Sequence, residues 1–191
     1  GRADGSFVPG SAPGVGMVNT EDKFQEIYEE YKNLILKSVY DMTGDFHLAQ
    51  DICQETFLRL HGYQDNIIVS KVKGWLLVVS SHLVYDYMKK ASSRREILTD
   101  GSRDSDTGVI DDQASIYLEQ AEQKQLCSSV LRALREKNED WYEVLMLVEY
   151  LGVPRKVVAR KRGVSLSTID NYLRKSKKWI KANFQKEYEE F

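Results

Sequence analysis

A chain of 191 residues, 42% hydrophobic and 29% charged, is long enough to bury the core of one domain or of two small ones. No apolar run approaches the roughly 20 residues of a membrane-spanning helix, and no charged-then-apolar leader opens the chain, so we expect a cytoplasmic protein without membrane insertion. The two cysteines, Cys53 and Cys127, lie in no CxxC or Cys/His spacing. This argues against a zinc site or a disulfide framework and favours two small core residues.

The first 16 residues, GRADGSFVPGSAPGVG, are rich in glycine and proline and have no apolar period. Such a composition is typical of a cloning remnant, although a natural flexible arm would look the same. We therefore expect residues 1–16 to lie outside the fold and take Met17 as the native start.

Most of the remaining chain has apolar residues at intervals of three and four, which predicts helices. The spacing is found from Phe24 to Ile35, from Val72 to Tyr87, from Leu118 to Leu134 and from Trp141 to Leu151. No stretch alternates as a β-strand would. The sequence therefore predicts an all-α protein.

Between Ala91 and Gln113 the sequence is rich in serine, aspartate and glycine and has no helical period. This composition is typical of a linker. We expect two small helical domains, residues 17–95 and residues 114–191, joined by a flexible acidic linker over residues 96–113.

The charges are laid out in blocks, although the net charge is only −2. Residues 18–70 and residues 96–125 each carry −6, whereas residues 71–95 carry +5 and residues 152–182 carry +9. One such block alone is often no more than a solvated helix face. Two basic blocks separated by acidic ones favour two separate surfaces for a polyanion.

The stretch DICQETFLRL, from Asp51 to Leu60, contains one apolar residue out of phase. Wound as a helix at about 100° per residue, it directs five side chains toward a core, namely Ile52, Cys53, Thr56, Phe57 and Leu60. Leu58 instead lies in the opposite, polar arc with Asp51, Gln54, Glu55 and Arg59. An incidental exposed leucine is common on any protein, but a leucine inside a polar ring also fits the centre of an interface.

The stretch VPRKVVARKRGVSLSTIDNYLRKSKKWI predicts a helix-turn-helix. Pro154 suits the start of a short helix, Gly163 can adopt the left-handed backbone of a turn, and Ser165 or Ser167 can cap the second helix. That helix directs Leu166, Ile169, Tyr172, Leu173 and Ile180 to one side and Ser167, Asn171, Arg174 and Lys178 to the other. The polar side suits DNA, and a basic helix packed in an ordinary bundle is the alternative.

Taken in order, these features resemble the extracytoplasmic-function type of RNA polymerase sigma factor. The resemblance covers about Lys23 to Phe184: DICQETFLRL, then GWLLVVSSHLVYDYMKKASSRR, then the acidic linker and the helix-turn-helix. The helix-turn-helix alone is a weak signal, because many regulators share it. The specific signal is the D-x-x-Q-x-T-F-x-R string, formed by Asp51, Gln54, Thr56, Phe57 and Arg59. The resemblance implies sigma region 2 in residues 17–95, sigma region 4 in residues 114–191, and a function in promoter recognition, DNA melting and transcription initiation.

The resemblance also implies three binding surfaces. Binding to the clamp helices of core RNA polymerase would fall to Asp51, Gln54, Glu55 and Leu58. Binding to the minus-ten promoter element would fall to Lys71, Lys73, His82, Tyr85 and Lys89. Binding to the minus-thirty-five element would fall to Ser167, Thr168, Asn171, Arg174, Lys175 and Lys178. The polymerase flap and an anti-sigma factor are further implied partners.

On the minus-ten helix we expect Lys71, His82, Tyr85 and Lys89 to project away from a core face that holds Trp75 and Leu83. Cations there would bind phosphate and the ring would stack on an unpaired base. His82 replaces the asparagine that is usual in the family, and MKK replaces an arginine-rich string.

The recognition helix departs from the family at Asp170 and Tyr172, where basic residues are usual. We expect Tyr172 to serve packing, and Asp170 to repel phosphate or to accept a hydrogen bond from a cytosine amino group. Base reading is therefore assigned to Asn171 and Arg174, and backbone anchoring to Lys175 and Lys178.

The linker contains five aspartates, namely Asp100, Asp104, Asp106, Asp111 and Asp112. An inert polar tether would have this composition. The resemblance instead implies a path through the polymerase cleft, where these charges would suit a channel built for nascent RNA.

A catalytic function finds no support in the sequence. The three histidines, His47, His61 and His82, form no HExxH motif, and there is no glycine-rich phosphate loop, so we expect no catalytic site, metal or cofactor. The alternative function is that of a helix-turn-helix regulator that binds duplex DNA alone, with its N-terminal helices serving dimerisation or effector sensing.

Overall fold

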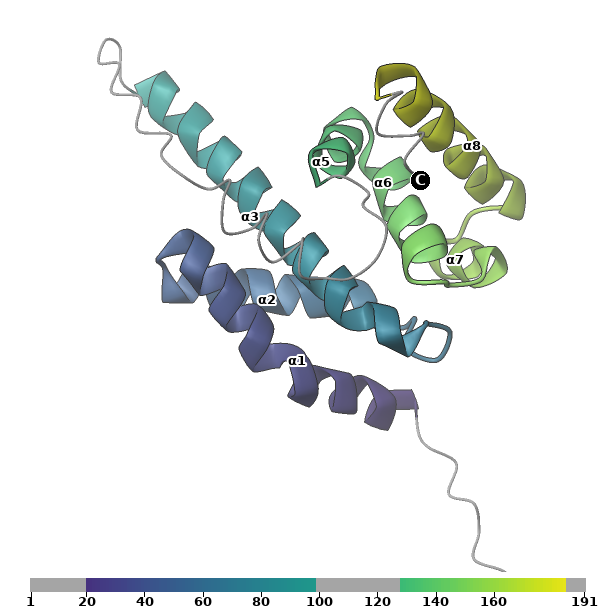
Figure 1. Cartoon of the computed structure of the whole chain (residues 1–191), viewed down its shortest axis with the longest axis horizontal. Coiled ribbons are helices and arrows are strands. Elements are labelled where there is room, and N and C mark those ends of the chain that lie inside the picture. Colours follow the sequence, from purple (N-terminus) through teal and green to yellow (C-terminus); the bar gives the residue numbers. More distant parts are fainter. Residues whose placement is uncertain (1–19, 99–127, 185–191) are drawn as a thin grey trace, which may run out of the picture.

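The computed structural model describes residues 20–98 and 128–184 (Figure 1). Every regular element within these two ranges is a helix, which confirms the all-α class. The helical pattern expected over residues 114–127, the linker aspartates and Cys127 lie outside the described residues.

The N-terminal bundle consists of α1 (Thr20–Thr43), α2 (Phe46–Leu60) and α3 (Val69–Leu98), and each helix packs against the other two. Its core is filled by side chains at helical spacing, among them Ile35, Phe57 and Leu76. The apolar stripes expected from the sequence therefore face one another, because burying them together removes the largest apolar area from water.

The turn between α1 and α2 is formed by Gly44 and Asp45. Gly44 adopts a left-handed φ of 66°, and its N–H donates to the carbonyl of Tyr40 at 2.8 Å, which ends α1. Asp45 then caps α2, since its Oδ1 accepts from the N–H of Leu48 at 3.1 Å. The cap helps to determine where α2 begins, and hence which of its residues face outward.

We expect Asp45→Ala to lower the free energy of unfolding by about 1 kcal/mol, because the N–H of Leu48 loses its acceptor. Urea unfolding followed by circular dichroism measures this change. Asp51→Ala on the same helix is the matched control, since Asp51 is exposed and such surface substitutions stay within about 0.5 kcal/mol. Equal losses in the two variants would contradict the capping role of Asp45.

The third helix is longer than the sequence suggests. α3 continues to Leu98, whereas the linker composition begins near Ala91. The expected domain boundary at residue 95 therefore lies within this helix. The physical reason is that Ala91, Arg94 and Arg95 are good helix formers, and extending an existing helix costs far less than nucleating one.

The C-terminal bundle consists of α5 (Ser128–Lys137), α6 (Glu139–Leu145), the π-helical turn η1 (Met146–Tyr150), α7 (Arg155–Arg162) and α8 (Leu166–Asn183). Asn138 caps α6 by accepting from the N–H of Trp141 at 3.0 Å. Leu131, Leu134 and Ile169 are fully or almost fully buried between these helices.

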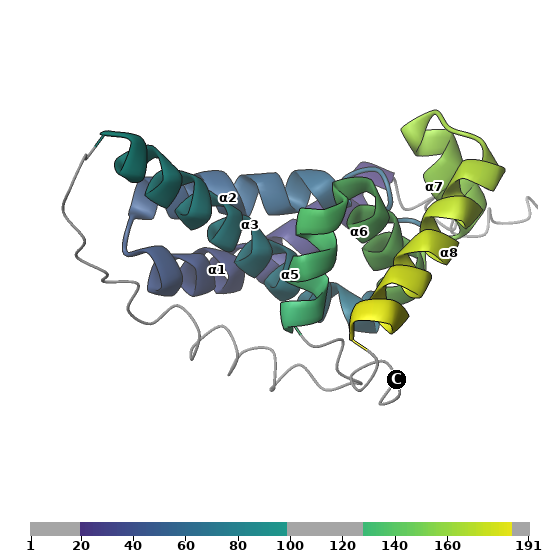
Figure 2. The same cartoon turned by 90° about the horizontal axis from the view of Figure 1, so that it is seen from above.

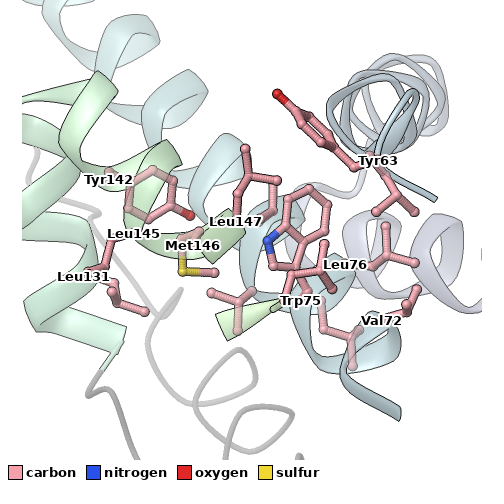
Figure 3. Packing of buried hydrophobic residues seen from close by; sticks show 14 of the residues in the cluster. Tyr63, Val72, Trp75, Leu76, Leu131, Tyr142, Leu145, Met146 and Leu147 are labelled. Atoms are coloured by element: carbon pink, nitrogen blue, oxygen red, sulfur yellow. The ribbon is translucent and has the colours of Figure 1, made fainter. Parts of the chain in front are cut away.

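The two bundles pack against each other (Figure 2). Just before α3, the N–H of Ile68 donates to the carbonyl of Leu151 at 2.9 Å. Trp75 of α3 lies beside Met146 and Leu147 of η1, and all three side chains are buried (Figure 3). Trp75 is thus a packing residue as expected, and one cluster of buried side chains extends through both bundles.

Candidate protein and nucleic-acid interfaces

The α2 face is defined here as Asp51, Gln54, Glu55 and Leu58. All four side chains are exposed, and Leu58 is 59% exposed. The other side of α2 buries Ile52, Cys53, Thr56, Phe57 and Leu60. The structure therefore confirms the helical phase expected from the sequence and presents an apolar side chain in a polar surround.

Arg59 connects the α2 face to the C-terminal bundle. Its Nε donates to Glu55 at 3.1 Å, and its Nη1 forms a short ion pair with Glu143 of α6. Glu143 also accepts from Nη1 of Arg162 at 2.6 Å. The sequence places Arg59 only in the polar arc, because a helical period carries no information about a partner 84 residues away.

The α3 face is defined here as Lys71, Lys73, His82, Tyr85 and Lys89. Lys73 and Lys89 are exposed, Lys71 and Tyr85 are half-buried, and His82 is only 1% exposed. The expectation that His82 projects away from Trp75 is wrong. Seven residues make about 700° of helix, so Trp75 and His82 point almost the same way and both are covered.

Residues of the C-terminal bundle contact three members of the α3 face. The hydroxyl of Tyr142 lies 2.6 Å from Nδ1 of His82. The guanidinium of Arg132 lies over the ring of Tyr85, with 4.7 Å to its centroid. In addition, Nζ of Lys89 donates to Glu136 at 2.9 Å.

The surroundings of Tyr142 and Lys89 favour the protonated form of each side chain. Burial raises the pKa of the Tyr142 phenol well above its ordinary value, so the hydroxyl keeps its proton and can donate to His82. The hydrogen bond to Glu136 raises the pKa of Lys89, which keeps its ammonium charged.

A second ion pair between the bundles lies next to the α3 face. Nε of Arg135 donates to Asp86 of α3 at 2.6 Å, and its Nη2 donates to Glu139 at 3.2 Å. The Arg135 side chain is almost completely buried, whereas Asp86 retains some exposure. Sequence reasoning missed both residues, since an aspartate and an arginine 49 positions apart show no pattern.

The helix-turn-helix is formed by α7 and α8. Gly163 ends α7 with a left-handed φ of 65°, as expected. Pro154 precedes the first helical residue, and Ser165 rather than Ser167 caps α8 by accepting from the N–H of Thr168 at 3.1 Å.

The α8 face is defined here as Ser167, Thr168, Asn171, Arg174, Lys175 and Lys178. Ser167, Arg174, Lys175 and Lys178 are exposed, while Thr168 and Asn171 are half-buried. Nη2 of Arg174 donates to Oδ1 of Asn171 at 2.7 Å, which holds the two expected base-reading groups side by side. The hydroxyl of Thr168 lies 2.9 Å from that of Ser165, so it belongs to the cap.

The two positions that depart from the family pattern have different surroundings. Tyr172 is half-buried against the core, in agreement with a packing role. Asp170 pairs with Nη1 of Arg155 at 2.5 Å, so a cation from the start of α7 offsets its charge beside the α8 face.

Within residues 20–98 and 128–184, no three His, Cys, Asp or Glu side chains converge as metal ligands would. Burial raises the pKa of the Cys53 thiol to about 11, so at neutral pH it is protonated and unreactive. No helix in the part of the chain that the structure describes is long and apolar enough to cross a membrane.

Comparison with known proteins gives matches to one family. The family model Sigma-70 region 2 matches residues 27–94. The ECF RNA polymerase sigma factor SigM of Bacillus subtilis is 42% identical over 65 residues, which cover 34% of this chain and 40% of SigM. The RNA polymerase sigma factor YlaC of the same organism is 23% identical over 170 residues, covering 88% of this chain and 96% of YlaC. The ECF RNA polymerase sigma factor SigW, also from Bacillus subtilis, is 27% identical over 69% of this chain and 72% of its own length.

Proposed function

Because residues 27–94 match Sigma-70 region 2 and the chain is similar to several ECF RNA polymerase sigma factors, we propose that it is itself a sigma factor of the extracytoplasmic-function type, which binds core RNA polymerase and directs it to initiate at promoters. The observation that carries this proposal is the α2 face. An exposed Leu58 set among Asp51, Gln54 and Glu55 has the composition of an interface with an apolar centre and a polar rim. These residues lie within the part of the chain that matches Sigma-70 region 2.

The proposal divides the work among three surfaces. The α2 face binds the clamp helices of the polymerase largest subunit. The α3 face binds the melted minus-ten element, with lysines for phosphate and Tyr85 for base stacking. The α8 face binds the duplex minus-thirty-five element, with Asn171 and Arg174 reading bases and Lys175 and Lys178 anchoring the backbone.

Further partners and the linker rest on the family resemblance alone. We propose the polymerase flap as a second contact on the core enzyme and an anti-sigma factor as a regulatory partner. The linker aspartates are proposed to line the path of nascent RNA.

The rival function, a regulator that binds duplex DNA alone, is tested by run-off transcription. The purified chain is added to bacterial core RNA polymerase and genomic fragments, and promoter-specific transcripts are measured. A sigma factor yields discrete transcripts that disappear when either the chain or the core enzyme is omitted. A regulator would shift duplex DNA by itself and yield no transcript with core polymerase, and that result would overturn the proposal.

A further inference from the structure

We infer that Arg155, at the start of α7, is a further contact to the DNA backbone, and that Asp170 of α8 is the positioning residue that holds it there. The inference deepens the proposed function and rests on it, since it assumes that the α8 face binds duplex DNA. It adds a phosphate contact that lies outside α8, and it gives Asp170 a role other than base reading.

The ion pair of Arg155 and Asp170 joins the two helices of the helix-turn-helix. Nη1 of Arg155 donates to Oδ1 of Asp170 at 2.5 Å, across 15 positions of sequence. Figure 2 shows α7 and α8 side by side, and the pair connects the first residue of α7 to the second turn of α8. A cation from α7 is thereby fixed beside the recognition helix.

The same pair lies at the edge of the α8 face. A hollow of about 520 Å³ lies between η1, the start of α7 and α8, and Arg155, Asp170 and Arg174 all line it. Arg174 belongs to the α8 face and follows Asp170 by one turn of helix. Arg155 therefore reaches the margin of the proposed DNA surface from a neighbouring helix.

The place of Arg155 on the first helix of the motif favours a contact to the DNA backbone. A helix-turn-helix puts its second helix into the major groove, while its first helix crosses the sugar-phosphate backbone. With α8 in the groove, we expect the strand that borders the groove on the Arg174 side to pass the start of α7. Arg155 then meets phosphate, next to the bases that Arg174 reads.

The guanidinium of Arg155 keeps donors for a phosphate while it is paired with Asp170. Toward the residues of the two described ranges it donates through Nη1 alone, and its side chain is 54% exposed. Nε and Nη2 lie along one edge of the planar fork and can bind two oxygens of one phosphate. Asp170 and a phosphate can therefore hold the same guanidinium from different edges.

Pairing with Asp170 affects DNA binding more than folding. An exposed ion pair adds little to stability, because water solvates both partners well when they separate. An arginine side chain that is already ordered, however, does not have to give up its rotamer freedom when DNA binds. Asp170 thus raises affinity through Arg155, although its own carboxylate repels phosphate.

The first test is the salt dependence of binding between the full chain and a fluorescein-labelled duplex of random sequence, measured by fluorescence anisotropy. A random sequence is suitable because backbone contacts carry no base preference. Arg155→Ala should weaken binding about 3- to 10-fold at low salt and reduce the slope of log affinity against log salt by about 0.9, the value for one phosphate contact. Arg155→Lys should retain the slope, since the charge stays, but lose part of the affinity together with the planar fork.

Arg160→Ala is the matched control, because Arg160 is an exposed arginine on the same helix. The five positions from Arg155 make about 500° of helix, so the two side chains point in different directions. The control should leave the slope unchanged. Lys178→Ala is the reference for the α8 face and should reduce the slope by about the same amount as Arg155→Ala.

The second test is a double-mutant cycle that separates positioning from repulsion. Asp170→Asn removes a negative charge, which by itself tightens binding by the same factor whether or not Arg155 is present. In the Arg155→Ala background we expect only this gain. With Arg155 present, the loss of positioning should offset the gain, so that the two effects differ by about 2- to 10-fold, the range for one side chain that must be ordered on binding. Circular dichroism checks the fold of each variant.

Three results contradict the inference. An unchanged slope in Arg155→Ala would show that Arg155 meets no phosphate. Equal effects of Asp170→Asn in the two backgrounds would show that Asp170 only repels DNA. A larger gain with Arg155 present would show that Asp170 withholds Arg155 from DNA. Failure of the proposed function is distinct, because Lys178→Ala would then leave the slope unchanged, or run-off transcription would be absent, whatever Arg155→Ala does.

Discussion

Replacing Gln54 with alanine and Leu58 with aspartate together should abolish binding to core RNA polymerase while leaving the fold intact. Leu58 is 59% exposed, so the chain loses no core packing when a carboxylate replaces it. Such surface substitutions change stability by no more than about 0.5 kcal/mol. At the centre of an interface, however, a buried unpaired carboxylate and a lost amide each cost about 2 kcal/mol or more, which lowers affinity at least several hundredfold in combination.

The measurement is a pull-down with core polymerase, supported by circular dichroism and thermal melting of the free variant. Phe46→Asp is the matched control, because Phe46 lies on the same helix, is 50% exposed and points in another direction. It should retain polymerase binding. Unchanged binding of the double variant would show that the α2 face is not the polymerase contact.

Arg174→Ala should weaken binding to the cognate minus-thirty-five element by about 1–3 kcal/mol and relax the preference at one or two base pairs. The guanidinium is exposed on α8 and hydrogen-bonded to Asn171 at 2.7 Å, so the two side chains are already held together in the free protein. Asp170 does not cancel its charge, because Asp170 is itself paired with Arg155. Fluorescence anisotropy with cognate and scrambled duplexes measures the two effects.

Lys178→Ala is the comparison for that experiment, since Lys178 is exposed on the same helix and is assigned to the DNA backbone. It should weaken all duplexes alike and reduce the salt dependence by about one phosphate contact. If Arg174→Ala instead weakened cognate and scrambled duplexes equally, then Arg174 would be a backbone contact and the reading of bases would lie elsewhere.

The sequence by itself determined the features that depend on a few neighbouring residues. The helical period placed Leu58 among exposed polar side chains and Phe57 in the core, and the structure agrees. The turn at Gly163 and the outward direction of Arg174 could likewise be predicted. Backbone dihedral preferences, caps and the 3.6-residue period are local, so they can be read from ten or twenty consecutive letters.

The end of α3 and the surroundings of His82 show where local reading fails. The residues that follow Ala91 have no apolar stripe, and their composition therefore predicted a linker. They include good helix formers, however, and they extend α3 to Leu98. The covered side of His82 could have been found, because its spacing of seven from Trp75 places both on one side of the helix. What the spacing does not contain is the identity of the group that covers it.

Only the tertiary structure decided how the two bundles meet. Tyr142 reaches His82 across 60 positions of sequence, and Glu143 reaches Arg59 across 84. Such pairs form because burial of apolar surface, including that of Trp75 against η1, brings the two bundles together. Polar and charged side chains at the edge of this contact then lie close enough to form hydrogen bonds and ion pairs. Their energy depends on the relative placement of whole bundles, so no window of consecutive residues encodes it, and the covered state of the α3 face could come only from the folded chain.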